Sequence, residues 1–390
     1  MTGAARPGMT GSTRLRIAGV DPEKGFAGGE AQVLGLTIGL IRRGHDAHLI
    51  CDPAGRLWEH ANANDIRCHP LRIRNSVDVR AALELRGILC RSQFDVVHFH
   101  TSRAHAMAPW VGALAGARVV TRRMDYRPNR LFARWLYNRA VDRVAAISGG
   151  VADSISAAGV DRDHIAVIPS GVDADYFAPP SLSERTDARG ALGIGADEIV
   201  VGAVGALEPR KGHRFLIEAI ARLRHTEDGG RVRCLIAGGG SLAGELAATI
   251  DRLELRDAVR LIGPIDNARD FLRAIDIFAL PSTNEGLGVA LLEAMASGLP
   301  AVASRVGGAA EAIVHGVTGY AVAPADADAI AADVGQLASS AGLRAAMGAA
   351  GRDRAVRCYA LETTIDRTIE LYRECIARRG REGKWRTCEA

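Results

Sequence analysis

Several features are scarce in this 390-residue chain, and each scarcity argues against a particular class of protein or site. No apolar run reaches the roughly 20 residues of a membrane-spanning helix. The longest run, residues 106–117, is interrupted by proline and glycine. The seven cysteines form no CxxC pair, which argues against a disulfide framework or a zinc site. No apolar segment typical of a signal peptide opens the chain, so we expect a cytoplasmic protein.

Lysine is also scarce, because only three of the 49 basic residues are lysines. The net charge is +4, and residues 118–143 carry eight arginines against two aspartates. A solvated helix face would explain this segment, and so would an anionic acceptor or an acidic membrane surface. No nucleic-acid recognition motif accompanies it, so we expect no nucleic-acid partner.

Short apolar runs, which we predict to be strands, alternate with amphipathic stretches twice along the chain; residues 46–51 and 117–122 are two of these runs. Near-continuous apolar strands separated by helices are typical of parallel sheets covered on both faces. We therefore predict an α/β protein with two Rossmann-like, doubly wound parallel-sheet domains that face a central cleft. The predicted parts are a flexible leader (1–14), a first domain (15–180), a second domain (181–360) and a C-terminal helix that packs back on the first domain (361–390).

Two motifs follow predicted strands. Gly28 and Gly29 open the first helix, where free N–H groups can approach an anion; a tight strand–helix turn explains them equally. In the second domain, a strand ends at Gly205, and Arg210 and Lys211 precede the next helix. Two cations at a positive helix start are unfavourable unless an anion compensates, so a diphosphate fits there.

The third motif is NEGLGVALLEAMASGLP, residues 284–300, which carries two glutamates eight positions apart. The glycines at 286 and 288 expose backbone N–H groups that can hold phosphate around Leu287. Glu293 lies one turn inside the following helix, where a carboxylate can accept both hydroxyls of a ribose. Glu285 lies at the loop tip, where the sugar beyond the phosphates would be. A helix cap with a buried salt bridge is the structural alternative for the pair.

This Glu285–Glu293 spacing resembles the signature of glycosyltransferase family 4, whose members are retaining enzymes of the GT-B fold. The segments GGEAQVLGLTIGLIRRGHDAHLI, LEPRKGHRFLIEAIARL and DIFALPSTNEGLG are similar to other landmarks of that family. The resemblance covers roughly residues 15–375 and is most specific in the second half.

The resemblance implies that the first domain binds the acceptor and the second a nucleotide sugar, with UDP-hexose expected ahead of GDP or ADP sugars. It assigns Glu293 to the ribose, Lys211 to the diphosphate and Glu285 to the donor sugar. The Gly28–Gly29 loop would close over the diphosphate. The resemblance also implies that no metal or other cofactor is needed. The expected acceptor is a glycan or lipid-linked glycan in cell-envelope polysaccharide or lipopolysaccharide synthesis, reached by peripheral binding to the inner membrane face. A soluble small-molecule acceptor is the alternative.

Two positions depart from the family pattern. Ala206 replaces the usual arginine after the strand glycine, and Arg210 is expected to supply the second charge. Arg123 occupies the position of a family histidine, which favours an anionic group over proton transfer. On the acceptor side we also expect His100, Arg103 and His105, although buried histidines at strand ends are more often structural.

Two other classes share this architecture. Sugar-nucleotide 2-epimerases would need catalytic carboxylates in the first domain and would lack the Glu285–Glu293 spacing. A catalytically inactive carbohydrate-binding or scaffold protein is supported only by Ala206 and Arg123.

Overall fold

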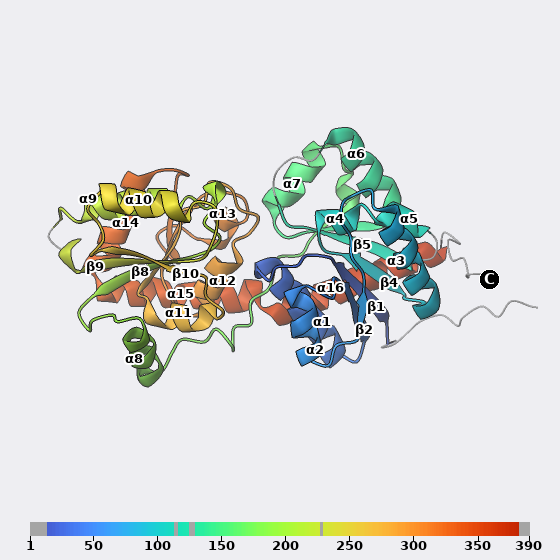
Figure 1. Cartoon of the computed structure of the whole chain (residues 1–390), viewed down its shortest axis with the longest axis horizontal. Helices are drawn as coiled ribbons and strands as arrows, with labels where there is room; N and C mark the ends of the chain where they lie inside the picture. Colours follow the sequence, from blue (N-terminus) through green and yellow to red (C-terminus); the bar gives the residue numbers. More distant parts are fainter. Residues whose placement is uncertain (1–13, 113–115, 125–128, 227–228, 382–390) are drawn as a thin grey trace, which may run out of the picture.

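The structure is a computed structural model that describes residues 14–112, 116–124, 129–226 and 229–381. All but the last residue of the expected leader 1–14 lies outside the described residues, and so does Arg127 of the arginine-rich segment. Two lobes lie side by side, each built on one parallel sheet (Figure 1). The predicted α/β fold with two doubly wound parallel sheets is therefore confirmed.

The first lobe contains a seven-stranded sheet with strand order β3-β2-β1-β4-β5-β6-β7. Its strands are β1 (Arg16–Asp21), β2 (Asp46–Cys51), β3 (Cys68–Pro70), β4 (Val96–Phe99), β5 (Ala117–Arg122), β6 (Arg143–Ala146) and β7 (Ile165–Val167). Every neighbouring pair is parallel, so the carboxyl ends of the strands share one edge. The three-residue edge strand β3 was not predicted, because its histidine and proline carry no apolar pattern.

The second lobe contains a six-stranded sheet with strand order β10-β9-β8-β11-β12-β13. Its strands are β8 (Ile199–Val204), β9 (Val232–Ala237), β10 (Val259–Gly263), β11 (Ile277–Leu280), β12 (Ala301–Ser304) and β13 (Gly319–Val322). The strands β4, β11 and β12 are buried along their whole length, as expected for a sheet covered on both faces.

Helices cover both sheets. In the first lobe they are α1 (Gly28–Arg42), α2 (Arg56–Ala63), α3 (Val79–Ser92), α4 (Ser102–His105), α5 (Ala108–Val111), α6 (Arg130–Trp135), the π-helical turn η2 (Leu136–Ala140) and α7 (Gly149–Ala157). In the second they are α8 (Leu182–Ala191), α9 (His213–Leu223), α10 (Ala243–Arg252), α11 (Ala268–Ala274), α12 (Val289–Ala296), α13 (Ala309–Ala312) and α14 (Ala327–Ser339). The chain ends in α15 (Ala341–Tyr359) and α16 (Leu361–Arg381).

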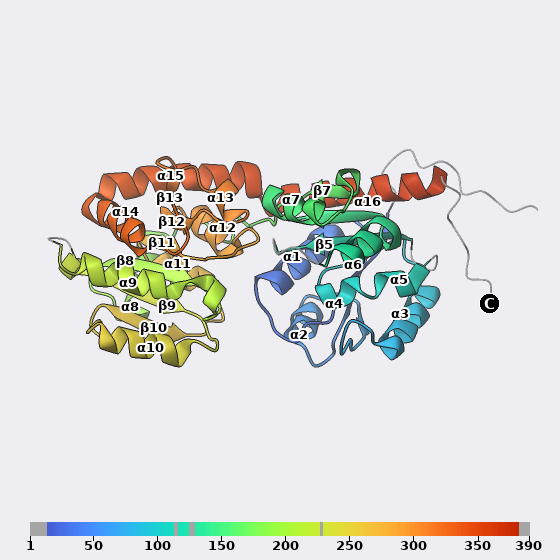
Figure 2. The same ribbon diagram turned by 90° about the horizontal axis from the view of Figure 1, so that it is seen from above.

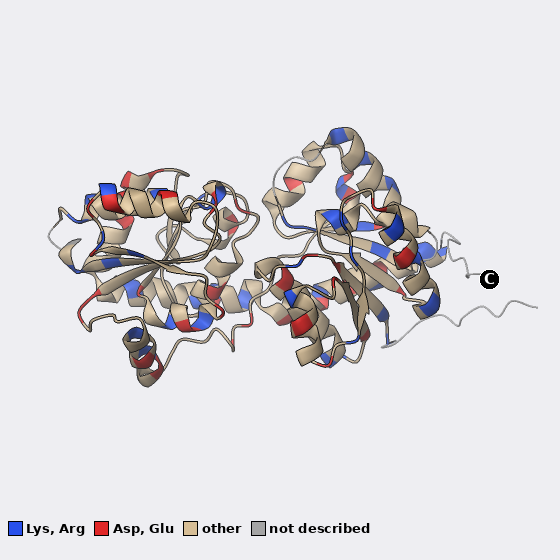
Figure 3. Ribbon diagram, in the orientation of Figure 1, with Lys and Arg blue, Asp and Glu red and all other residues tan. Residues whose placement is uncertain are grey.

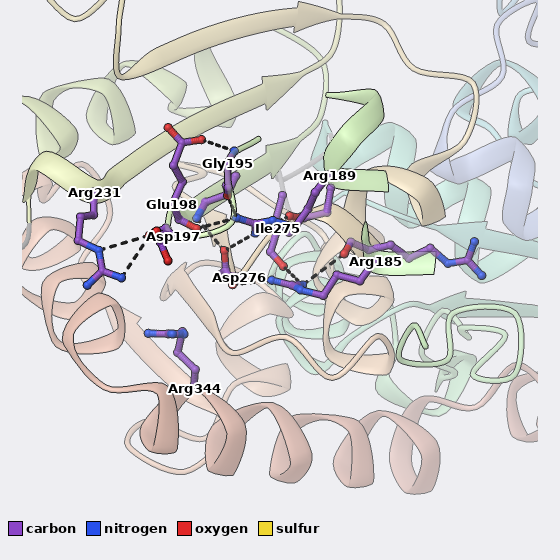
Figure 4. Close-up of polar contacts among 12 residues, drawn as sticks. Arg185, Arg189, Gly195, Asp197, Glu198, Arg231, Ile275, Asp276 and Arg344 are labelled. Atoms are coloured by element: carbon purple, nitrogen blue, oxygen red, sulfur yellow. Dashed lines mark hydrogen bonds and ion pairs between the residues drawn. The ribbon is translucent and has the colours of Figure 1, made fainter. Parts of the chain in front are cut away.

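Helix α8 is anchored to the second lobe by a polar network (Figure 4). Arg185 donates to one Asp276 carboxylate oxygen at 2.6 Å, and Arg189 donates to the other at 3.1 Å. The backbone N–H of Val200 also donates to this carboxylate. The network therefore ties α8 to the amino end of β8 and β11.

The last two helices lie along one side of both lobes, α15 on the second and α16 on the first (Figure 2). Ile365 and Tyr372 of α16 are fully buried in the core of the first lobe. A Cβ at Gly39 of α1 would overlap the Ile365 side chain, so this glycine permits the close approach of the two helices. Among the described residues, no helix is long and apolar enough to cross a membrane.

Candidate functional site

The second lobe brings together the loops that follow β8 and β11 at the carboxyl edge of the sheet. Gly212 has φ +64°, and a Cβ there would overlap the carbonyl oxygen of Pro281. The backbone N–H of Thr283 donates to the Arg210 carbonyl at 2.8 Å. The two loops therefore pack backbone to backbone, and only a glycine fits at their closest approach.

Lys211 and Glu285 form an ion pair at this junction. The Lys211 Nζ lies 2.5 Å from Glu285 Oε2, and the side chains are only 14% and 10% exposed. Ser282 Oγ donates to the same oxygen at 3.3 Å. The two residues assigned by resemblance to the diphosphate and the donor sugar thus hold each other in this structure.

Arg210 is placed differently from Lys211. Its guanidinium Nε donates to Glu208 Oε2 at 3.0 Å, and its side chain is 36% exposed. The second cation expected from the sequence is therefore engaged by a carboxylate of its own loop.

Glu293 projects from α12, whose other side chains are mostly buried. Burial raises the pKa of its carboxyl group to about 7. Among the described residues, its carboxylate has no hydrogen-bond or ion-pair partner, although the side chain is partly exposed. A desolvated carboxylate without a partner is costly, and such groups concentrate where a ligand binds.

Glycines shape the backbone around these carboxylates. Gly205 has φ +159° and Gly288 has φ +82°, and Gly288 precedes the first residue of α12. The Leu287 side chain is 1% exposed, so only its backbone can face a ligand.

His213 is a site residue that the sequence reasoning missed. It is the first residue of α9, it is 4% exposed, and its ring lies against the backbone of Gly205 and Ala206, in the loop after β8. Burial and the nearby Lys211 lower its pKa to about 4, so the ring is neutral at pH 7. Its position directly after Lys211 and Gly212 could have indicated from the sequence that it lies at the site.

The first lobe closes over this site through its glycine loop. A Cβ at Gly28 would lie 3.6 Å from Val289, the first residue of α12, and one at Gly29 would lie 3.9 Å from Arg123. A Cβ at Gly286 would overlap the carbonyl oxygen of Arg123. Gly28 and Arg123 of the first lobe therefore lie against the segment that carries Glu285 and begins α12.

Arg123 faces two carboxylates of its own lobe, Asp21 and Glu30. Burial lowers the pKa of Arg123, and these carboxylates oppose the shift. Asp21, at the end of β1, is 1% exposed, and burial raises its pKa to about 7 despite the attraction of Arg123. The sequence reasoning missed Asp21, although an aspartate that ends a strand was a visible signal.

The predicted acceptor-side histidines are fully or nearly buried. Burial lowers the pKa of His105 to about 3, and its Nδ1 lies 3.2 Å from the Tyr137 hydroxyl. Burial also holds the pKa of His100 well below its usual value, and its Nδ1 has no partner among the described residues. The neighbouring His98 contacts the Tyr372 hydroxyl of α16 and Thr121, both at 2.6 Å. All three rings are therefore neutral at pH 7.

Arg103 is occupied within the first lobe. Its guanidinium pairs with the Glu23 carboxylate and donates to the carbonyl of Ile73 at 3.2 Å. It therefore connects the loops after β1 and β3.

A second contact between the lobes lies at the start of α7. Ser148 Oγ donates to the Gly286 carbonyl at 2.9 Å. The N–H groups of Gly149 and Gly150 donate to the Glu311 carboxylate at 3.1 and 2.8 Å. A carboxylate at a helix N-terminus is favourable, so Glu311 stabilises the closed arrangement. Among the described residues, no cluster of three or more potential metal ligands is found.

Comparisons with known proteins cover both lobes. A family model described as glycosyl transferases group 1 matches residues 184–354, and one described as glycosyltransferase family 4 matches residues 26–176. A D-inositol 3-phosphate glycosyltransferase from Kribbella flavida is 31% identical over 74% of this chain and 68% of its own length. The corresponding protein from Corynebacterium urealyticum is 36% identical over 54% of this chain, which spans about half (51%) of that relative.

Solved structures share the fold of both lobes. HepE from Anabaena, in complex with UDP and glucose, has a TM-score of 0.83 and 22% identity over 93% of this chain and 100% of its own. A glycosyltransferase from Rickettsia africae has a TM-score of 0.82 and 22% identity over 94% and 99% of the two chains.

Proposed function

The chain belongs to the group 1 glycosyltransferases of family 4, and on that premise we propose that it transfers a hexosyl group, with retention, from a UDP-sugar to an acceptor hydroxyl. One observation carries the donor assignment. Glu293 is a desolvated carboxylate without a partner, beside a helix start and within the lobe that holds Lys211. A ribose supplies the two hydroxyl donors that this carboxylate lacks.

UDP is proposed ahead of GDP and ADP because HepE, which shares the fold, was solved with UDP and with UDP-glucose. Lys211 and the backbone N–H groups from Gly286 to Gly288 would hold the diphosphate, and Glu285 the donor sugar. Gly28, Gly29 and Arg123 would complete the site from the first lobe. We propose that these groups stabilise the leaving diphosphate without a metal ion.

The reaction forms a bond between the acceptor oxygen and the anomeric carbon as the bond to the diphosphate breaks. Retention requires attack from the face of the leaving group, so a diphosphate oxygen can take the acceptor proton. Lys211 then stabilises the charge that develops on the diphosphate.

For the acceptor we propose an anionic molecule. A pocket of about 390 Å3 lies in the first lobe, beside the ends of β2 and β3, and three arginines line it (Arg72, Arg74 and Arg80). Two carboxylates, Asp78 and Glu84, line it as well. The first candidate is a glycan or lipid-linked glycan of the cell envelope. The second is a phosphorylated small polyol, favoured by the relatives named D-inositol 3-phosphate glycosyltransferases.

Calorimetry with UDP, GDP and ADP in the absence of metal tests the donor assignment. We expect UDP to bind most tightly, and Glu293→Ala to lose at least about tenfold in affinity, since two hydroxyl contacts disappear. Glu245→Ala, an exposed change on α10, is the matched control. Absence of binding by all three nucleotides would favour the inactive scaffold. Product analysis with a donor panel separates transfer from epimerisation.

A further inference from the structure

Helix α6 and the π-helical turn η2 have two apolar faces, of which only one is covered by the protein. The inner face contains Ala133, Leu136, Tyr137 and Ala140, each at most 7% exposed. The outer face presents Leu131, Phe132 and Trp135, which are 83%, 49% and 51% exposed. The Phe132 and Trp135 ring centroids lie 6.3 Å apart. This outer set, here called the apolar ridge, is too large and too clustered for an ordinary surface helix.

Arginines flank the apolar ridge. Arg130, Arg134 and Arg139 are exposed, and residues 129–141 include no acidic residue. Arg130 donates only to the Ala157 carbonyl, and Arg134 and Arg139 have no ion-pair partner among the described residues. Figure 3 shows blue segments along the ribbon in the region of α6, on the lobe that we propose binds the acceptor.

We propose that the apolar ridge and its arginines dock on an anionic lipid bilayer. Exposed Trp, Phe and Leu beside arginines are the combination that inserts into the boundary between headgroups and acyl chains. The two signals reinforce each other, since apolar burial and attraction to anionic headgroups add. A second copy of the chain is a poor occupant, because two arginine-flanked ridges would repel each other.

The ridge is held rigidly enough to present its side chains. Arg130 and Asn138 both donate to carbonyls at the end of α7 (Ala157 and Gly159), and the Tyr137 hydroxyl contacts His105. Helix α7 in turn is capped at its N-terminus by Ser148, which contacts the second lobe. The docking proposal rests on the proposed function and extends it. A membrane-docked protein would meet a lipid-linked acceptor beside the lobe that we propose binds it.

Vesicle co-flotation of the full chain tests the docking. We expect binding to vesicles of phosphatidylcholine with phosphatidylglycerol, and at least about tenfold weaker partitioning to phosphatidylcholine alone. The triple variant Leu131→Ser, Phe132→Ser, Trp135→Ser should lose at least about tenfold on the anionic vesicles. Leu182→Ser on α8 removes an equally exposed leucine, also 83%, and should change nothing.

The double variant Arg134→Gln, Arg139→Gln tests the contribution of charge separately, and it should also weaken binding to anionic vesicles. Arg252→Gln, an exposed change on α10, is the control and should leave vesicle binding unchanged. Wild type that does not float with anionic vesicles, or triple variant that floats equally well, overturns the docking. Concentration-dependent dimers lost in the triple variant would assign the ridge to self-association and also overturn it. UDP calorimetry on the same samples reports folding and the donor site, so failure of docking and failure of the proposed function are distinguishable.

Discussion

The raised pKa of Glu293 predicts how donor binding depends on pH. The carboxylate must be ionised to accept two ribose hydroxyls, and its pKa in the unliganded protein is about 7. About one-tenth of the molecules carry the ionised form at pH 6, and about nine-tenths at pH 8. We therefore expect the dissociation constant of UDP-glucose to fall about tenfold, or about 1.4 kcal/mol, between these pH values.

UDP-glucose is the right probe, because the terminal phosphate of UDP itself titrates near pH 6. Calorimetry in two buffers of different ionisation enthalpy should show release of about 0.9 proton per donor bound at pH 6. In Glu293→Gln both the slope and the proton release should disappear. Asp333→Asn is the matched control, because burial also raises the pKa of Asp333, which lies on α14 and has no proposed role in donor binding. A wild-type affinity that does not change from pH 6 to 8, or a slope that survives in Glu293→Gln, would refute the assignment of Glu293 to the ribose.

Three further outcomes follow from the same geometry. The folded-state pKa of Glu293 lies above its usual 4.5, so its contribution to stability is complete below that value and is lost as the pH rises through about 7. Denaturant unfolding at pH 8 should therefore show that Glu293→Gln is more stable than wild type by about 2 kcal/mol. This is less than the full pKa shift implies, because the side chain is partly exposed. The gain in stability should shrink at pH 5. Lys211→Gln leaves Glu285 buried without its cation and should lower the free energy of unfolding by about 3 kcal/mol at pH 7 in the same assay. Adding Glu285→Gln should recover most of this loss. A double variant no more stable than the single one would contradict the pairing. Gly286→Ala places a Cβ against the Arg123 carbonyl and should hold the lobes apart, so small-angle scattering should give a larger radius of gyration and turnover should fall, whereas Gly342→Ala, which meets no atom, should change neither.

Much of the fold is predictable from local patterns. The strands β2 and β5 coincide with the predicted runs 46–51 and 117–122, because short apolar runs between amphipathic stretches are typical of strands in a covered parallel sheet. The edge strand β3 is not predictable in this way, since its three residues pair with only one neighbour and need no apolar run.

The donor loops are also predictable, because glycines at a strand–helix junction indicate a tight turn or a close backbone approach. What cannot be read locally is which side chain has a partner. The sequence places Glu285 at a loop tip and Glu293 inside a helix, but it does not show that Glu285 pairs with Lys211 while Glu293 has no partner among the described residues. Nothing in the sequence indicated the role of Glu311, since its contacts with Gly149 and Gly150 span 162 and 161 residues and form only when the lobes meet.

This difference between the two glutamates determines what a donor has to do on binding. Glu293 is a desolvated carboxylate that would gain from hydroxyl donors, so on the proposed assignment the nucleoside end would find a prepared site. Lys211 is engaged at 2.5 Å by Glu285, and a diphosphate must compete for its ammonium group. On the proposed assignment, Glu285 would then face the space beyond the phosphates, where a sugar hydroxyl could donate to it. A nucleotide without a sugar would leave that buried carboxylate without its cation. We therefore expect the paired state to favour the intact nucleotide sugar over the free nucleotide, which would help the protein to bind its donor and release its product.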